Sequence, residues 1–346
     1  MENMDYRLVA IPGEGIGLEV IEAALTVLQA VAKLHNFSIE VDYALLGKPA
    51  CDKYGSYLPE ATIEACQNSA GILFGAVSKG GLLELRRKFD FFANLRPVKS
   101  YPSLVEKSSL KRDRAENVDI LFVRELVSGI YFGESVRNTN SGYHTMYYAD
   151  SQIKRIAEVA LKQAQKRKKL LTVAHKENAL PNLPWTKIVS EVGAKYPDVV
   201  IEPMLVDNLA MQLVLNPQRF DVIVAGNLFG DILSDLGGAI VGSIGLLGSA
   251  SFNSEGLGLY EPVHGTAPDI AGQNIANPFG AIASVMMMLT QWGEIDAVNS
   301  IEQTWQSILN QGYRTADLYH KTPENSEILV TTDELVTLFV SKLGCI

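Results

Sequence analysis

Residues 221–235 read DVIVAGNLFGDILSD and join a short apolar run to a helical pattern that carries two aspartates. The run 221–225 is rich in β-branched residues, which favours a buried strand. If a helix begins near Gly230, Asp231 and Asp235 lie four residues apart and share one helix face. Two carboxylates placed in this way, just after a strand, can bind one hard cation. A helix-end charge and a surface acid are the alternative interpretation.

Outward from this segment, short β-rich runs alternate with helical patterns over most of the chain. This order predicts an α/β fold with a mainly parallel sheet and crossover helices. The expected strands are 8–12, 38–44, 71–76, 120–124, 170–174, 199–205 and 221–225. The expected helices are 17–35, 61–69, 151–166 and 185–195.

The composition describes a chain that can bury a large core. Its 346 residues, of which 47% are hydrophobic and 20% charged, suit two domains or one large domain. Its 30 Lys and Arg against 39 Asp and Glu give a net charge of -9, which argues against nucleic acid or an anionic membrane as partner. The apolar stretches are too short or too rich in Gly and Ser to span a bilayer, and the first residues lack the basic start of a signal peptide.

The three cysteines, Cys51, Cys66 and Cys345, show no C-x-x-C spacing. Their odd number and their spacing predict neither a disulfide framework nor a structural zinc site. A reducing compartment suits such a chain, so we expect a cytoplasmic location.

Residues 13–17, GEGIG, follow the first expected strand and invite a dinucleotide-binding interpretation. Their spacing departs from the G-x-G-x-x-G fingerprint, and no acid follows a second strand in the expected setting. We therefore expect a tight strand-to-helix turn here and no Rossmann phosphate loop.

Three arginines suggest an anionic ligand. Arg86 and Arg96 flank a short amphipathic segment, and Arg124 ends the apolar run 119–123, where a buried cation needs a partner. Each arginine alone is compatible with a structural salt bridge. Together they indicate a site for a polycarboxylate, because arginine binds carboxylates through two parallel hydrogen bonds.

Two further features complete the candidate site. Asp207 follows the expected strand 199–205, and a set of three carboxylates favours Mg²⁺ or Mn²⁺ over zinc. Residues 261–272, EPVHGTAPDIAG, are dense in Gly, Pro and small polar residues, which is typical of a ligand-binding loop. A plain structural loop is the alternative for this segment.

Taken together, these segments resemble the β-decarboxylating dehydrogenases that act on 2-hydroxy acids, the family of isocitrate and isopropylmalate dehydrogenases. The resemblance runs from residues 11–17 to 312–317, is most specific over 226–235 and 261–278, and is closest to the isopropylmalate branch. It implies a two-domain fold with one continuous central sheet, unrelated to the Rossmann fold. Residues 1–100 and 249–346 would form the dinucleotide-loop domain, and 101–248 the dimerisation and metal-site domain.

The resemblance also assigns roles to individual residues. The implied catalytic residues are Tyr131 and Lys176. The implied substrate-binding residues are Leu82, Leu83, Arg86, Arg96, Arg124 and Asn178. The implied ligands of Mg²⁺ or Mn²⁺ are Asp207, Asp231 and Asp235. The implied dinucleotide-binding residues are His264, Gly265, Ala267, Asp269, Ile270 and Asn277.

In this family each active site is shared across a homodimer, with Lys176 and Asp207 contributed by the other subunit. The implied reaction is the oxidative decarboxylation of a 2-hydroxy dicarboxylic acid. The implied cofactor is NAD, because Asp269 can accept hydrogen bonds from the adenosine ribose hydroxyls and would repel a 2′-phosphate.

The side group of the substrate is a separate question. Isocitrate-type members carry small polar residues where Leu82 and Leu83 stand, so two leucines favour an apolar branch, as in 3-isopropylmalate of leucine biosynthesis. The alternative is that both leucines are core residues. Lys79 lies about where the isopropylmalate branch keeps a glutamate, and residues 86–90, RRKFD, are similar to tartrate and D-malate dehydrogenases.

Other functions therefore stay open at this point. D-malate, tartrate, isocitrate and homoisocitrate are the alternative substrates for the same reaction. A noncatalytic regulatory subunit is the alternative of another class. The presence of Lys176, Tyr131 and the three aspartates counts against that second alternative.

Overall fold

The computed structural model describes residues 4–320 and 326–344, so Cys345 lies outside the described part. The chain divides into two compact units. Unit 1 comprises Met1–Phe89, Gly242–Ala250 and Ser254–Ile346, and unit 2 comprises Asp90–Val241 and Ser251–Asn253.

One sheet of ten strands has the order β2-β1-β3-β12-β11-β4-β5-β10-β8-β9. Pairing is parallel between β1 and both β2 and β3, between β3 and β12, and along β5, β10, β8 and β9. Strands β4 and β5 are antiparallel. The expected α/β fold with a continuous, mainly parallel central sheet is therefore confirmed.

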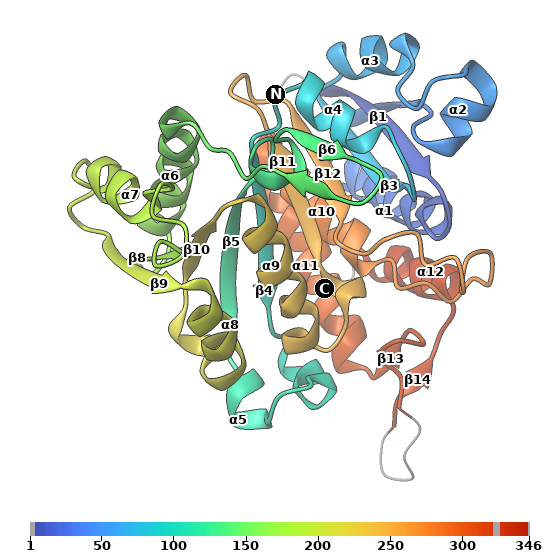
Figure 1. Cartoon of the computed structure of the whole chain (residues 1–346). Coiled ribbons are helices and arrows are strands. Elements are labelled where there is room, and N and C mark those ends of the chain that lie inside the picture. The colour runs from blue at the N-terminus through green and yellow to red at the C-terminus, as the bar shows by residue number, and fades with distance from the viewer. Residues whose placement is uncertain (1–3, 321–325, 345–346) are drawn as a thin grey trace. The chain divides into compact units, whose positions relative to one another are not determined.

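Unit 1 contains the first strands and the C-terminal helices, drawn in blue and in orange to red in Figure 1. Its strands are β1 (Asp5–Gly13), β2 (Ser38–Tyr43), β3 (Gly71–Ala76), the first part of β11 (Gly248–Phe252), β12 (Gly258–Pro262), β13 (Tyr313–Arg314) and β14 (Ile328–Leu329). Its helices are α1 (Gly17–His35), α2 (Lys48–Tyr54), α3 (Glu60–Gln67), α4 (Leu82–Lys88), η4 (Ile244–Leu246), α10 (Phe279–Trp292), α11 (Ile295–Asn310) and α12 (Thr332–Lys342). Helices α1 and α10 pack against one another in its core.

Unit 2 carries the antiparallel pair and the helices between residues 90 and 241. Its strands are β4 (Ala93–Lys99), β5 (Asp119–Glu125), β6 (Ser135–Arg137), β7 (Gly142–His144), β8 (Leu170–His175), β9 (Val200–Leu205), β10 (Val222–Ala225) and the end of β11. Its helices are η1 (Pro102–Lys107), α5 (Arg112–Ala115), η2 (Gly129–Tyr131), α6 (Asp150–Gln165), α7 (Trp185–Gly193), α8 (Val206–Leu215), η3 (Pro217–Arg219) and α9 (Asn227–Val241). Helix α6 packs on β5 and β10, and α9 packs on β4 and β5.

The turn after β1 is as expected from its sequence. Gly15 has a φ of +60°, and a Cβ at this position would lie 2.0 Å from the carbonyl oxygen of Thr266. The backbone N–H of Ile16 donates to that same oxygen at 2.9 Å. The glycine turn thus meets the loop after β12 directly, and both belong to unit 1.

Some elements differ from the sequence predictions. Helix α9 begins at Asn227, three residues before the expected start near Gly230. Strand β4 was not expected, because its polar residues and Pro97 weaken the strand pattern. Strand β11 was not expected either, because its sequence, GSASF, lacks β-branched residues. Among the described residues, no helix has the length and hydropathy needed to cross a membrane.

Candidate active site

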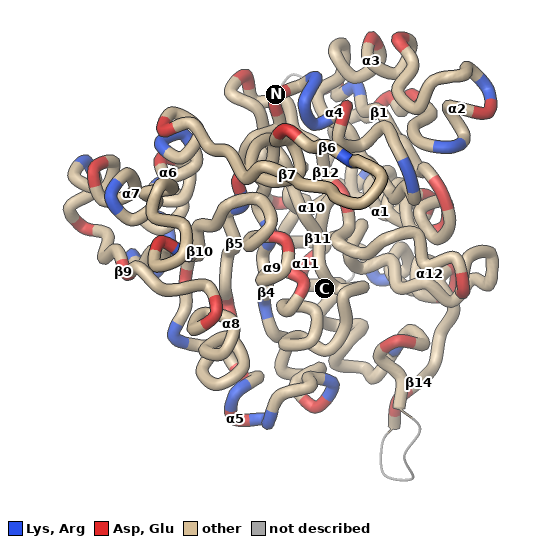
Figure 2. The backbone as a smooth tube through the Cα atoms, viewed as in Figure 1, with Lys and Arg blue, Asp and Glu red and all other residues tan. Residues whose placement is uncertain are grey.

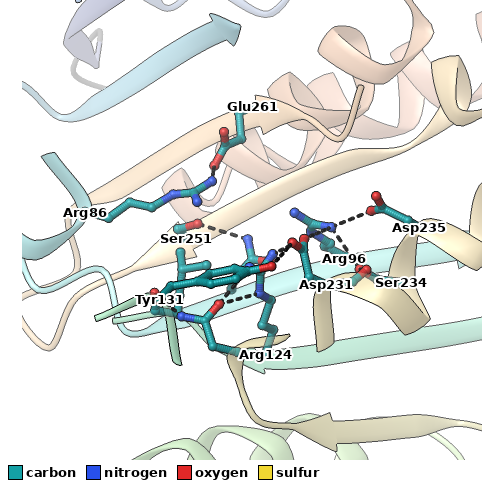
Figure 3. A network of polar contacts seen from close by, with 12 residues as sticks. Arg86, Arg96, Arg124, Tyr131, Asp231, Ser234, Asp235, Ser251 and Glu261 are labelled. Carbon is teal, nitrogen blue, oxygen red and sulfur yellow. Dashed lines mark hydrogen bonds and ion pairs between the residues drawn. The ribbon is translucent and has the colours of Figure 1, made fainter. Parts of the chain in front are cut away.

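Arg124, near the end of β5, is only 2% exposed and has the partners that a buried cation requires. Its Nη1 donates to Oδ1 of Asp231 at 2.5 Å. Its Nε and Nη2 both donate to Oδ1 of Asn227, at 3.1 and 2.7 Å. A Cβ on Gly230 would lie 2.7 Å from Arg124 Cγ, so the missing side chain lets α9 approach β5 closely. Figure 3 shows Arg124 and Asp231 in contact.

Arg96, on β4, contacts the same helix about one turn further along. Its Nη1 donates to Asp235 Oδ1 at 2.9 Å and to Ser234 Oγ at 2.9 Å, and lies 3.3 Å from Asp231 Oδ1. One guanidinium therefore contacts both Asp231 and Asp235, and the two carboxylates lie on one face of α9 as expected (Figure 3). The Nε of Arg96 is buried and donates no hydrogen bond within the described residues.

Tyr131 ends the 3₁₀ helix η2 and contacts the same aspartate. Its hydroxyl donates to Asp231 Oδ2 at 3.0 Å, and Arg124 Cζ lies 5.9 Å from the centre of its ring. Partial burial, followed by the negative charge of Asp231, raises the pKa of Tyr131 above its usual value. The phenol is therefore a protonated donor at neutral pH.

A nearby cation would stabilise the charged forms of the two carboxylates on α9. Burial raises the pKa of Asp235 above its usual value, and the charge of Asp231 adds to this, whereas Arg96 opposes it. Within residues 4–320 and 326–344, no group of three or more His, Cys, Asp and Glu side chains lies close enough together to hold a metal ion. A single chain thus brings together two of the three expected metal ligands, and Asp207 is not in that pair.

Asp207 instead pairs with Lys176. The Nζ of Lys176, directly after β8, donates to Asp207 Oδ1 at 2.7 Å, and this bond is the main reason that the pKa of the Asp207 carboxyl lies below its usual value. Asp207 is in the first turn of α8, and its side chain is 64% exposed. Asn178 is exposed in the turn that follows Lys176.

Arg86, on α4 in unit 1, forms a buried ion pair. Its Nη2 lies 2.7 Å from Glu261 Oε1, and both side chains are less than a tenth exposed (Figure 3). Its Nε donates no hydrogen bond in the part of the chain that the structure describes. Leu83 is 43% exposed and Leu82 is half-buried, so in the chain as described neither is a core residue.

The loop after β12 carries the expected dinucleotide residues, all in unit 1. His264 is buried, its Nδ1 lies 2.9 Å from the Gly265 carbonyl, and its buried Nε2 has no hydrogen-bond partner among the described residues. Burial lowers the pKa of His264, which favours the neutral imidazole. A Cβ on Gly265 would meet no atom within 4 Å, and Asp269 is exposed.

The other loop residues are fixed by the backbone or by neighbours. Ala267 has a φ of +38°, and the N–H of Ile270 donates to its carbonyl at 3.1 Å. The amide of Asn277 donates to Asp317 Oδ2 at 3.0 Å and accepts from the N–H of Phe279 at 3.0 Å. Hydrogen bonds within the loop and to Asp317 therefore hold these residues in place.

Four contributors escaped the sequence prediction, namely Asn227, Ser234, Glu261 and Asp317. Asn227 was open to detection, because it precedes Asp231 and Asp235 by four and eight residues and so shares their helix face. Glu261 lies 175 residues from its partner Arg86, and no spacing rule connects them.

Comparison with known proteins identifies the family that the sequence resembles. Residues 7–338 match the model of the isocitrate/isopropylmalate dehydrogenase family. The chain is 44% identical over 353 residues to a 3-isopropylmalate dehydrogenase of Halalkalibacterium halodurans, covering 96% of this chain and 97% of the relative. It is 42% identical over 360 residues to the same enzyme of Bacillus subtilis, covering 98% of both chains.

Solved structures give the same result. The isocitrate dehydrogenase of Methylococcus capsulatus has a TM-score of 0.88 at 30% sequence identity, covering 98% of this chain and 99% of that one. The TT0538 protein of Thermus thermophilus has a TM-score of 0.87 at 29% identity, covering 98% of this chain and 68% of that one. With most of its length matched by family and relatives, the chain belongs to the isocitrate/isopropylmalate dehydrogenase family.

Proposed function

We propose that the chain catalyses the NAD- and divalent-metal-dependent oxidative decarboxylation of 3-isopropylmalate to 2-oxo-4-methylpentanoate, a step of leucine biosynthesis. The observation that carries this proposal is the cluster in unit 2, where Arg96, Arg124 and Tyr131 all contact Asp231. The relatives at 42–44% identity are called 3-isopropylmalate dehydrogenases, which favours this substrate over D-malate, tartrate, isocitrate and homoisocitrate.

The arginines provide unused donors for an anionic substrate. The Nε atoms of Arg86 and Arg96 are buried and donate no hydrogen bond within the residues described. A buried donor without a partner costs free energy, which a substrate carboxylate would recover. We assign the substrate carboxylates to Arg86, Arg96 and Arg124, and a further substrate contact to Asn178. The exposed Leu83, with Leu82, supports an apolar branch on the substrate.

The aspartates of α9 suit a hard divalent cation. Asp231 and Asp235 offer only oxygen ligands from one helix face, and their side chains are 31% and 52% exposed, which fits Mg²⁺ or Mn²⁺. Asp207 would complete the set from a second copy of the chain. Such a cation, when bound, lowers the pKa of the substrate hydroxyl and stabilises the enolate that forms as CO₂ leaves.

Proton transfer is assigned to two side chains. Lys176 would accept the proton of the substrate hydroxyl, directly or through water, and NAD⁺, when bound, would supply the hydride acceptor. Its bond to Asp207 fixes the position of its amino group. Tyr131 would then donate a proton to the enolate carbon, and its raised pKa keeps that proton in place until then. The presence of these groups argues against a noncatalytic regulatory subunit.

NAD is assigned to the loop after β12. The buried Nε2 of His264 has no hydrogen-bond partner among the described residues, and the space beside Gly265 is open, which fits a polar ligand at this loop. Asp269 would accept hydrogen bonds from the adenosine ribose, with Ala267, Ile270 and Asn277 shaping the rest of the site.

A second copy of the chain fits the surface of α8. Asp207 shares one face of this helix with Met211, Val214 and Leu215, which are 44–51% exposed. Covering this apolar face with a second copy would bring Asp207 into the interface, as a shared active site requires. Residues of the hairpin β6–β7 are all exposed, and an isolated two-stranded hairpin is marginally stable without a partner.

These features support a homodimer with shared active sites. We place the dimer contacts and the metal site in residues 101–248, and the dinucleotide loop in 1–100 and 249–346. Acidic and basic residues are interspersed on α5 and α7 (Figure 2), and the net charge is -9. Both support a small-molecule substrate instead of nucleic acid or a membrane surface. The cysteine pattern supports work in the cytoplasm.

The test measures both products of one reaction. With 3-isopropylmalate, NAD⁺ and Mn²⁺, the protein should release NADH and CO₂ in equal amounts. After chelation both products should vanish, and both should return when Mn²⁺ is restored. NADH without CO₂ would contradict the proposed decarboxylation, and undiminished turnover in chelator would contradict the metal.

A further inference from the structure

The buried amide of Asn227 joins separate parts of the proposed active site. Asn227 is the first residue of α9 and is 0% exposed. Its Oδ1 accepts from Nε and Nη2 of Arg124, at 3.1 and 2.7 Å. Its Nδ2 donates to the carbonyl oxygens of Leu126 and Ser128, both at 2.9 Å. The oxygen thus accepts two hydrogen bonds and the nitrogen donates two, so the amide is fully used.

The two ends of this amide face different functional groups. Two hydrogen bonds to one oxygen fix the plane of the Arg124 guanidinium, because the donors of arginine have a rigid fork geometry. On the other side, residues 126–128 lead straight into η2, which ends at Tyr131. The donor end of Asn227 therefore holds the segment that carries the proposed proton donor.

The backbone of Asn227 ties in the metal-binding helix. Its N–H, which a helix leaves without an internal partner, donates to Tyr148 Oη at 2.8 Å. The same tyrosine limits the 129–131 turn, since a Cβ on Gly129 would lie 2.2 Å from its Oη. Asp231 and Asp235 follow Asn227 on the same helix face. A shift of Asn227 would thus move the start of α9 together with its partners.

We propose that Asn227 is a positioning residue that couples the orientation of Arg124 to the placement of Tyr131. It acts through these two side chains and is assigned no contact with substrate or cofactor. The inference rests on the proposed function. A plain structural role, in which Asn227 only satisfies the start of α9, predicts a loss of stability with no selective change in kinetics.

The test uses variants of the full-length protein. Asn227→Leu keeps a similar volume and removes every side-chain hydrogen bond. Asn227→Asp keeps an acceptor for Arg124 and places a second acceptor against the carbonyls of Leu126 and Ser128. Leu161→Ala, a buried change on α6 in the same unit, controls for loss of stability alone.

The kinetic readout separates positioning from stability. With 3-isopropylmalate, NAD⁺ and Mg²⁺, Asn227→Leu should raise the substrate KM and lower kcat, each by about tenfold, while KM for NAD⁺ changes less than about twofold. Asn227→Asp should lower kcat equally with a smaller rise in KM. Leu161→Ala should leave all three constants within about twofold below its melting temperature. In a Tyr131→Phe background, Asn227→Leu should reduce kcat by less than about twofold further, because the two changes act on one step.

Hydrogen exchange gives a readout that needs no turnover. Amides of residues 126–131 should exchange faster in Asn227→Leu and Asn227→Asp than in the parent, and at the parent rate in Leu161→Ala. If the parent fails to turn over any 2-hydroxy acid, the proposed function fails and exchange alone decides the positioning role. Unchanged exchange, or a kcat loss fully additive with Tyr131→Phe, overturns the inference. Should Asn227→Leu fail to fold, Asn227→Asp decides between the two roles by the same criteria.

Discussion

The hydroxyl of Tyr131 donates a hydrogen bond of 3.0 Å to Oδ2 of Asp231, whose other oxygen accepts from a buried arginine. The proposed proton donor and a proposed metal ligand are thus in direct contact within one chain. A single negative charge on Asp231 holds the phenol and balances Arg124, which is 2% exposed. Changes at Asp231 should therefore affect metal binding, substrate binding and proton transfer together.

Asp231→Asn removes this charge and preserves the side-chain shape. Hydrogen bonds to charged groups contribute about 1.5–3 kcal/mol, so kcat/KM should fall by roughly tenfold to a hundredfold. Titration calorimetry with Mn²⁺ should show weaker binding, and Asp296→Asn, an exposed change on α11, should leave both measurements unchanged. Full turnover of Asp231→Asn in chelator-treated buffer would refute the metal assignment.

Asp269 should determine the choice between NAD and NADP. A carboxylate that faces the adenosine ribose disfavours a 2′-phosphate by about 1–3 kcal/mol, on the scale of charged hydrogen bonds. Asp269→Ser should lower the NAD-to-NADP ratio of kcat/KM by about tenfold to a hundredfold. The exposed Gln273, whose side chain bonds the Asp269 carbonyl, offers a control as Gln273→Ala. Parent enzyme that uses both cofactors equally would show that Asp269 faces elsewhere.

Gly15 and Gly55 form a matched pair for the first turn. Both have positive φ, +60° and +74°, but a Cβ on Gly15 would meet Thr266 O at 2.0 Å, whereas one on Gly55 would meet no atom within 4 Å. Both Gly→Ala changes bear the backbone strain, and only Gly15→Ala adds overpacking of about 1–3 kcal/mol. Urea unfolding should rank Gly15→Ala below Gly55→Ala by that amount, and only Gly15→Ala should raise KM for NAD⁺. Equal stability of the two variants would contradict the close approach of turn and loop.

Much of the fold could be predicted from the periodicity of apolar residues in the sequence. Helix α1 begins at Gly17 and ends at His35 as predicted, because its apolar residues recur at helical spacing and Asn36, in the left-handed region, ends it. Strand β4 was not predicted, because Arg96 and Pro97 are unusual in a buried strand. The buried arginine is explained only by its partners on α9. A local sequence pattern cannot reveal a partner that lies on a distant element.

The candidate site shows the same division. The pairing of Asp231 with Asp235 followed from helical spacing, and the need of Arg124 for a partner followed from burial. The identity of each partner did not follow, since Arg96 and Ser234 are 138 residues apart and meet only through packing of α9 on the sheet. The pairing of Asp207 with Lys176, 31 residues away, likewise follows from no spacing rule.

Mixed dimers test the shared site. Lys176→Ala should abolish oxidation of the hydroxy acid, and Tyr131→Phe should slow chiefly protonation of the enolate while metal and NAD still bind. If Lys176 acts across the interface, a Lys176→Ala chain paired with a Tyr131→Phe chain should regain about one active site per dimer, because one site then draws both functional residues from different chains. Verified heterodimers without recovery would place both residues in the same chain's site. Homodimers of each variant, mixed after assembly, provide the control.

The most direct test of the central claim is the rank order of kcat/KM over a panel of 2-hydroxy acids. The parent protein would be assayed with NAD⁺ and Mg²⁺ on 3-isopropylmalate, D-malate, tartrate, isocitrate and homoisocitrate. Contact of Leu82 and Leu83 with the isopropyl group, at about 0.8 kcal/mol per buried carbon, should place 3-isopropylmalate at least about tenfold above D-malate. A higher kcat/KM for D-malate, tartrate or a tricarboxylate than for 3-isopropylmalate would contradict the account.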